Sequence, residues 1–151
     1  MKILIGIDDS PQSREAMKFL REAAWARNAE ILVLSSVEIS AYVLVEPAGA
    51  AVYDSLQRDQ RRAHERLVTD AVRELTEAGL AARGKVEEGD ARDALVRAAE
   101  TERVDLLVVG SHGRTGLAKL LLGSVASHVV THAPCSVVVV KSRAPKGGPS
   151  S

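Results

Sequence analysis

Five short apolar runs alternate with four amphipathic stretches along the chain, and this alternation restricts the fold more than any other feature of the sequence. Four of the runs are nearly continuous in Ile, Val and Leu, which is typical of strands covered on both faces of a parallel sheet. The predicted strands are Ile3–Ile7, Ile31–Val37, a weaker Lys85–Glu88, Leu106–Val109 and Val137–Val140. Alternating strands and helices predict an α/β fold with one doubly wound open sheet of five parallel strands. Right-handed crossovers favour the strand order 3-2-1-4-5, with helices on both faces.

Residues that favour helix ends flank the amphipathic stretches. Ser10 is a good N-cap, and Pro11 follows it at the first helical position. Asp90 is suited to cap a third helix in the same way, and Gly79 is suited to end the longest one. The apolar residues at helical spacing therefore predict helices near 11–24, 56–78, 91–99 and 125–130.

Length and charge limit the class of protein. A chain of 151 residues fits one domain with a sizeable core, which we assign to 1–141. The last residues, 142–151, are rich in Pro, Gly and Ser, and we expect them to form a disordered tail. The formal net charge is zero and aromatic residues make up 3%. Because nucleic-acid-binding proteins usually carry a basic face or aromatic stacking platforms, we expect no nucleic-acid partner.

The sequence also indicates where the protein works. No apolar stretch approaches the roughly 18 residues of a membrane span, and no signal peptide is visible. The single cysteine, Cys135, has no partner for an internal disulfide and is interpreted as a small buried hydrophobe. We therefore expect a cytoplasmic protein that has no membrane partner.

A glycine-rich segment follows the fourth predicted strand. Its pattern is Gly110-x-x-Gly113, nine further residues, and then Gly123-Ser124. Glycines let backbone N–H groups approach a ligand closely, and a turn that leads into a helix binds phosphate groups well. In the predicted strand order, the first and fourth strands flank the point where the winding reverses, which is where such sheets bind ligands. The segment therefore predicts a nucleotide site between Asp8 and Gly110.

Charged residues near this segment suggest further roles. Asp8 and Asp9, directly after the first strand, are candidates to hold Mg²⁺, although Asp9 is also a candidate to help cap the first helix. Arg114 lies within the glycine loop and is a candidate to neutralise phosphate charge. His128 and His132 have a spacing used by zinc helices, but no third ligand is evident, so we expect no metal site there.

The segment from Asp105 to Ala126 resembles the universal stress protein family, in particular its ATP-binding branch, whose signature is Gly-x2-Gly-x9-Gly-Ser. Ile7-Asp8-Asp9-Ser10 is similar to the first-strand motif of the family, and Gly89-Asp90-Ala91 is similar to the start of its third helix. The chain departs from the pattern at Ser136, where the family often has proline. The resemblance covers nearly the whole chain and implies a universal stress protein-like nucleotide-binding domain over 1–141.

Carried over position by position, the resemblance implies a site for ATP. At the adenine and ribose end it places Asp8, with Ser10 beside it, and Val37. Around the ribose and the first phosphate it places Val109, Gly110 and Gly113. Toward the outer phosphates it places Gly123, Ser124 and Val125.

These observations predict a stress-response regulator that holds ATP with Mg²⁺ and acts as a switch or sensor. No residue is evident as a general base poised to activate water, so we expect at most slow hydrolysis or autophosphorylation. An alternative is a phosphorelay receiver phosphorylated on aspartate, in which Asp8-Asp9, Ser111 and Lys141 would form the site. Against it, the third predicted strand ends in Glu87-Glu88-Gly89 without an aspartate.

The last predicted strand, Val137–Val140, would lie at an edge of the sheet with no helix after it. An exposed apolar edge is a liability unless something covers it. We therefore expect a homodimer through this strand, together with a downstream protein partner that the sequence does not identify.

Overall fold

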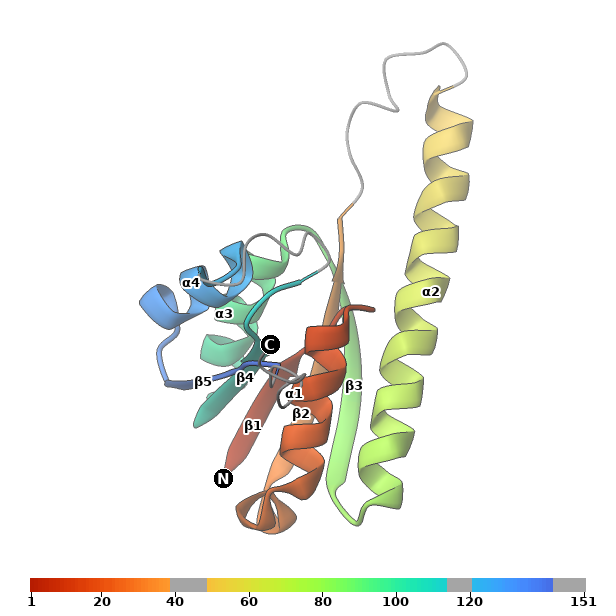
Figure 1. Cartoon of the computed structure of the whole chain (residues 1–151). Helices are drawn as coiled ribbons and strands as arrows, with labels where there is room; N and C mark the ends of the chain where they lie inside the picture. Colours follow the sequence, from red (N-terminus) through yellow and green to blue (C-terminus); the bar gives the residue numbers. More distant parts are fainter. Residues whose placement is uncertain (39–48, 114–120, 143–151) are drawn as a thin grey trace, which may run out of the picture.

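The computed structural model describes residues 1–38, 49–113 and 121–142. Its centre is a five-stranded sheet in the order β3-β2-β1-β4-β5, in which all four neighbouring pairs are parallel (Figure 1). The strands are β1 Lys2–Gly6, β2 Glu30–Val37, β3 Ala81–Glu88, β4 Leu106–Gly110 and β5 Ser136–Val140. The predicted fold class and strand order are confirmed.

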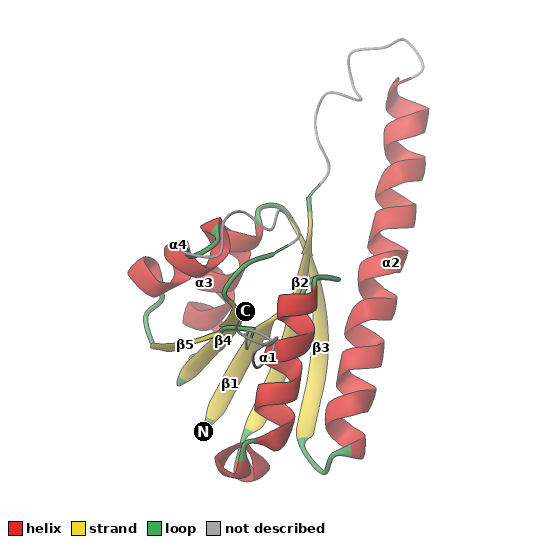
Figure 2. Ribbon diagram, in the orientation of Figure 1, coloured by secondary structure: helices red, strands yellow, loops and turns green. Residues whose placement is uncertain are grey.

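Helices cover both faces of the sheet (Figure 2). The helical elements are α1 Pro11–Glu22, a short 3-10 helix η1 Ala24–Asn28, α2 Gly49–Glu77, α3 Ala91–Thr101 and α4 Ser124–His132. Ile3 and Ile5 of β1 belong to the core beneath α1 and α2, whereas Leu4 belongs to the core beneath α3 and α4. This alternation explains the continuous apolar runs, because successive side chains of a strand point to opposite faces and both faces are covered.

The predicted helix ends are confirmed at three positions. Ser10 accepts a hydrogen bond from Ser13 N at 3.1 Å, and Asp90 accepts one from Arg92 N at 2.8 Å. Hydrogen bonds from Arg92 hold the pKa of the Asp90 carboxyl below its usual value. Gly79 has a φ of +86° and follows α2 in a conformation that glycine tolerates without a steric penalty.

Strand β3 is longer than the predicted Lys85–Glu88. It pairs with β2 along its whole length, from Ala81 opposite Glu30 to Glu88 opposite Val37. The prediction missed its first half because β3 is an edge strand with many exposed residues. A β-strand of this kind lacks the continuous apolar run that marks a fully covered strand.

The order of the strands places the first and fourth at the centre of the sheet. Chain connections run outward from β1 to β2 and β3, and then β4 and β5 build the other side. The carboxyl ends of β1 and β4 therefore flank the reversal point that the sequence predicted. None of the described helices is long and apolar enough to cross a membrane. The predicted tail lies, beyond Ser142, outside the described residues.

Candidate functional site

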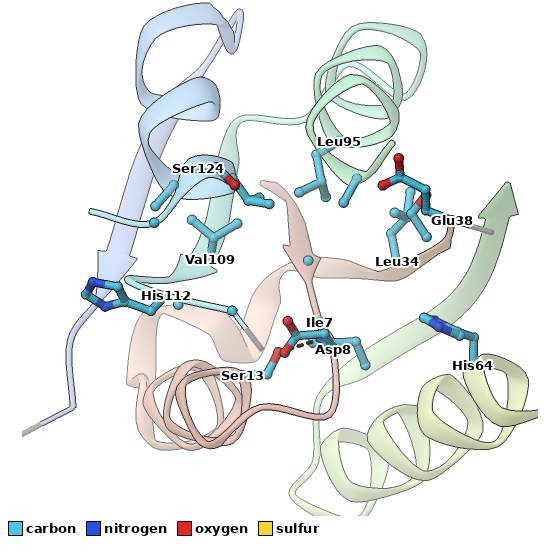
Figure 3. A pocket seen from close by; sticks show the side chains of 18 of the residues that line it. Ile7, Asp8, Ser13, Leu34, Glu38, His64, Leu95, Val109, His112 and Ser124 are labelled. Atoms are coloured by element: carbon cyan, nitrogen blue, oxygen red, sulfur yellow. Dashed lines mark hydrogen bonds between the residues drawn. The ribbon is translucent and has the colours of Figure 1, made fainter. Parts of the chain in front are cut away.

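A cavity of about 570 Å³ opens at the carboxyl ends of β1, β2 and β4 (Figure 3). Its walls come from the carboxyl ends of these strands and from α1, α2, α3 and the start of α4. The volume falls within the range of small-molecule sites in proteins. Of the candidate residues, the structure brings together around this cavity Asp8, Val109, Gly110, Gly113, Gly123, Ser124 and Val125.

The start of α4 forms one end of the cavity. Gly123 is the N-cap and has no side chain to satisfy the N–H groups of the first turn. These N–H groups, together with the helix dipole, favour an anion at this end. Gly123 N donates to the Ser111 carbonyl at 2.7 Å, and a Cβ atom on residue 123 would lie 3.1 Å from His112 Cα. The two halves of the glycine motif are therefore packed directly against each other.

Close approach also explains the other two glycines of the motif. A Cβ atom on residue 110 would lie 2.9 Å from backbone atoms of Gln12 in α1. A Cβ atom on residue 113 would lie 2.9 Å from Asp8 Oδ2. Real Cβ atoms rarely approach other atoms so closely, so residue 110 requires glycine for space, whereas a Cβ atom on residue 113 would displace the end of the Asp8 side chain.

Hydrogen bonds hold Asp8 at the centre of the site. Its Oδ1 accepts from Ser10 N at 2.9 Å, and its own backbone N donates to Ser13 Oγ at 2.7 Å. Figure 3 shows Asp8 and Ser13 together between the glycine end and the far end of the cavity. The carboxylate is therefore oriented by the same turn that begins α1.

Two candidate residues do not line the cavity. Ser10 is 3% exposed, and its hydroxyl serves the N-cap of α1. Val37 is 3% exposed and its carbonyl accepts a hydrogen bond from Gly89 N, whereas its neighbours Ser36 and Glu38 line the wall. Strand alternation is the reason, because adjacent residues of β2 face opposite sides of the sheet. A third candidate, Arg114, lies outside the described residues.

The end of the cavity opposite α4 combines apolar walls with several polar groups. Leu34 from β2, Leu56 from α2 and Leu95 from α3 form its walls. Polar groups at this end are Ser36, Glu38, Gln60 and His64. A pocket with apolar walls and a few convergent polar groups suits a flat heterocycle.

Sequence reasoning missed His64, although a signal was present. Apart from Gly49 at its first position, the buried positions of α2 are His64, Val68, Ala71 and Leu75, which recur at helical spacing along one face. A histidine is thus the polar member of an otherwise apolar stripe. It is 8% exposed and lies at the wall of the cavity.

The sheet order also bears on the receiver alternative. Receiver-type domains have the order 2-1-3-4-5, which places the third strand beside the first. Here β2 separates β3 from β1. The end of β3 therefore does not adjoin Asp8 as a receiver would require, and the alternative is wrong.

Strand order and cleft together define a doubly wound, Rossmann-like α/β domain with its ligand cavity at the reversal point of the sheet. The family model described as the universal stress protein family matches residues 1–141. The chain therefore belongs to the universal stress protein family, and the resemblance noted in the sequence is confirmed at the level of the family.

Individual relatives agree with this assignment. The chain is 33% identical over 142 residues to universal stress protein MJ0531 of Methanocaldococcus jannaschii, with 93% of this chain and 81% of that protein covered. The structure of universal stress protein UspA from Lactobacillus plantarum superposes with a TM-score of 0.81 at 24% identity, covering 93% and 97% of the two chains. At 24% identity, the similarity to the Lactobacillus plantarum structure supports the fold alone.

Some solved relatives carry adenine nucleotides. A universal stress protein in complex with cAMP is 26% identical, with a TM-score of 0.63 and 93% and 96% of the two chains covered. A family member from Arabidopsis thaliana with AMP bound is 21% identical, with a TM-score of 0.69 and 95% and 93% covered. Adenine-nucleotide binding thus occurs among proteins of this fold.

Proposed function

We propose that this protein binds ATP with Mg²⁺ in the cavity at the carboxyl ends of the strands. We further propose that it acts as a stress-response regulator, a switch or sensor rather than an efficient catalyst. The observation that carries the proposal is the uncapped start of α4 facing a glycine-lined cavity. Helix N-termini of this kind bind phosphate through backbone N–H groups and the helix dipole. The adenine nucleotides in solved relatives support the same ligand class.

The two ends of the cavity set the orientation of the nucleotide. In the proposal, the phosphates lie against the N–H groups of Ser124 and Val125, with the Ser124 hydroxyl as a further donor. The N–H of Gly123, which the resemblance also assigned to the phosphates, donates instead to the Ser111 carbonyl. The base lies between Leu34 and Leu95 at the apolar end. Asp8 lies between them, and Val109 and Gly110 lie beneath the ribose.

The negative charge of the cavity is the reason for including Mg²⁺ in the proposal. Among its described lining residues, the carboxylates are Asp8 and Glu38, and neither lysine nor arginine lines it. Bringing a triphosphate beside Asp8 is unfavourable unless a cation lies between them, and Mg²⁺ is usually held by one or two carboxylates together with phosphate oxygens. Arg114, outside the described residues, stays a predicted phosphate contact.

Identifying the bound ligand tests the proposal. We expect purified protein, once denatured, to release an adenine nucleotide identifiable by chromatography and mass spectrometry. Titration of nucleotide-free protein with ATP should show binding that is tighter with Mg²⁺ than with EDTA, because the cation relieves the repulsion at Asp8. Protein that releases no nucleotide and gives no heat with ATP would contradict the proposal.

We also propose that two copies pair through β5. This strand lies at the edge of the sheet, bonded on one side to β4, and Val137–Val139 are half-buried. A second copy would cover the valine edge and satisfy its backbone groups. We expect light scattering at micromolar concentration to give about twice the 16.1 kDa chain mass.

A charge on the edge strand should disrupt that dimer. We expect Val137→Lys to shift the mass to one chain, because lysine on an edge strand opposes pairing with another strand. The matched control is Val130→Lys on α4, which is 51% exposed and lies outside β5. A single-chain mass for the unmodified protein would show that β5 does not pair.

A further inference from the structure

Helix α2 extends beyond the sheet that it covers. Figure 1 shows its first half continuing past the carboxyl ends of the strands, whereas its second half lies along β3. We call residues 50–63 the projecting half of α2, and none of them, all within the described part of the chain, is buried. In the second half, Val68, Ala71 and Leu75 belong to the core shared with the sheet. The second half is therefore anchored by core packing, and the projecting half is not.

One face of the helix runs through both halves. Leu56, Gln60 and His64 are four residues apart, so they lie one above another on this face. The same spacing leads on to Val68, which is buried against the sheet. Leu56 and Gln60 line the cavity, at the end assigned to the base. Where the sheet ends, the cavity therefore takes its place beneath this face of α2.

The contacts that hold the projecting half in place are weak. Arg61 pairs with Glu88 at the end of β3, at 3.1 Å, and with Glu65 in the next turn, at 3.2 Å. Both ion pairs are exposed, and exposed pairs of this kind contribute little to stability. Because helical segments of this length are marginal in water without packing, we expect the projecting half to open more easily than the rest of α2.

We propose that the nucleotide stabilises the projecting half by filling the cavity beneath Leu56 and Gln60, so that the order of this half depends on whether the site is occupied. A base between Leu34 and Leu95 would cover the exposed part of the Leu56 side chain, which is 40% exposed. A ligand shifts an equilibrium toward the state that it binds better, here the closed helix. This inference rests on the proposed nucleotide function and identifies the element that responds when the proposed switch binds its ligand.

Hydrogen–deuterium exchange of the full chain tests the inference. In the nucleotide-free protein we expect the backbone amides of residues 52–63 to exchange faster than those of residues 66–77. Mg·ATP should slow exchange at 52–63 roughly 3- to 10-fold, the factor expected from covering the exposed part of one leucine side chain. Mass spectrometry of peptides from the two halves of α2 gives both rates in one experiment.

Two variants of the projecting half separate the cavity contact from a general effect on the helix. Leu56→Ala removes the contact with the base, and the slowing by Mg·ATP should fall below about 2-fold. The matched control is Val52→Ala, an apolar residue of the same half that is 48% exposed and outside the cavity lining. It should keep the slowing of the unmodified protein. Each protein is measured with Mg·ATP at about 100 times its own dissociation constant, so weaker binding does not imitate the expected result.

The outcomes distinguish this inference from the proposed function. If ATP does not bind, both fail. If ATP binds and exchange at residues 52–63 is unchanged, the nucleotide function stands and the coupling to α2 is refuted. The coupling is also refuted if Leu56→Ala keeps the full slowing, or if Val52→Ala loses it to the same extent, because the effect would then not pass through the cavity.

Discussion

Replacing Gly123 by valine is expected to eliminate ATP binding while the protein remains folded. A Cβ atom at this position would lie 3.1 Å from His112 Cα and 3.2 Å from the Ser111 carbonyl oxygen. The added side chain must therefore push the start of α4 away from the other half of the glycine motif. Backbone N–H groups bind phosphate only when they converge, so we expect the affinity for ATP to fall by at least about 100-fold, the loss of two or more charge-assisted hydrogen bonds.

Two measurements check this expectation. Titration with Mg·ATP reports the affinity, and thermal unfolding without nucleotide reports whether the fold is kept. Thr131→Val is the matched control, since it introduces the same side chain on the exposed face of the same helix. If Gly123→Val binds Mg·ATP as tightly as the unmodified protein, the start of α4 does not bind the phosphates as proposed.

Replacing Gly110 by alanine is expected to destabilise the fold itself. The new Cβ atom would lie 2.9 Å from the backbone carbon and oxygen of Gln12, at the first turn of α1. Backbone in a helix does not yield as a side chain does, so α1 or β4 must shift. Overpacking of this kind costs about 1–3 kcal/mol of the free energy of unfolding, which corresponds to roughly 2–4 °C in Tm per kcal/mol for a chain of this size.

Gly113→Ala is the comparison that isolates the backbone contact. Among the described residues, its Cβ atom would meet only the Asp8 carboxylate, the end of a side chain. We expect this variant to lose less than about 1 kcal/mol of stability and to weaken Mg·ATP binding by displacing Asp8. Thermal or urea unfolding of the two variants side by side measures the difference. Equal stability losses would show that the approach of α1 to β4 is not what requires glycine at position 110.

The fold was predictable where its signals are local. The covered strands β1, β2 and β4 are continuous apolar runs, and the caps at Ser10 and Asp90 depend on residues within one turn. Strand β3 was predicted only in part, because its pairing with β2 stabilises residues that are individually exposed. The helix η1 was not predicted at all, since the sequence there has no strong pattern.

The candidate site was likewise predictable from the sequence only in part. Asp8 and the glycines follow strands whose ends a doubly wound sheet brings together, so their meeting at one cavity was predictable. The choice between Val37 and its neighbours required the register of β2, which decides which face each side chain takes. The contact between His64 and Ser35 required the packing of α2 over β2, between residues far apart in the sequence.

The amino-acid sequence by itself determined the alternation of strands and helices and the glycine motif, because periodicity, caps and motif spacing are properties of neighbouring residues. The strand order followed from that alternation through the preference for right-handed crossovers. Only the tertiary structure decided which side of β2 faces the cavity, that α1 approaches Gly110, and that Ser35 Oγ contacts both the Ile7 carbonyl and the His64 ring. These features depend on the distance and direction between separate elements, which local sequence patterns do not specify.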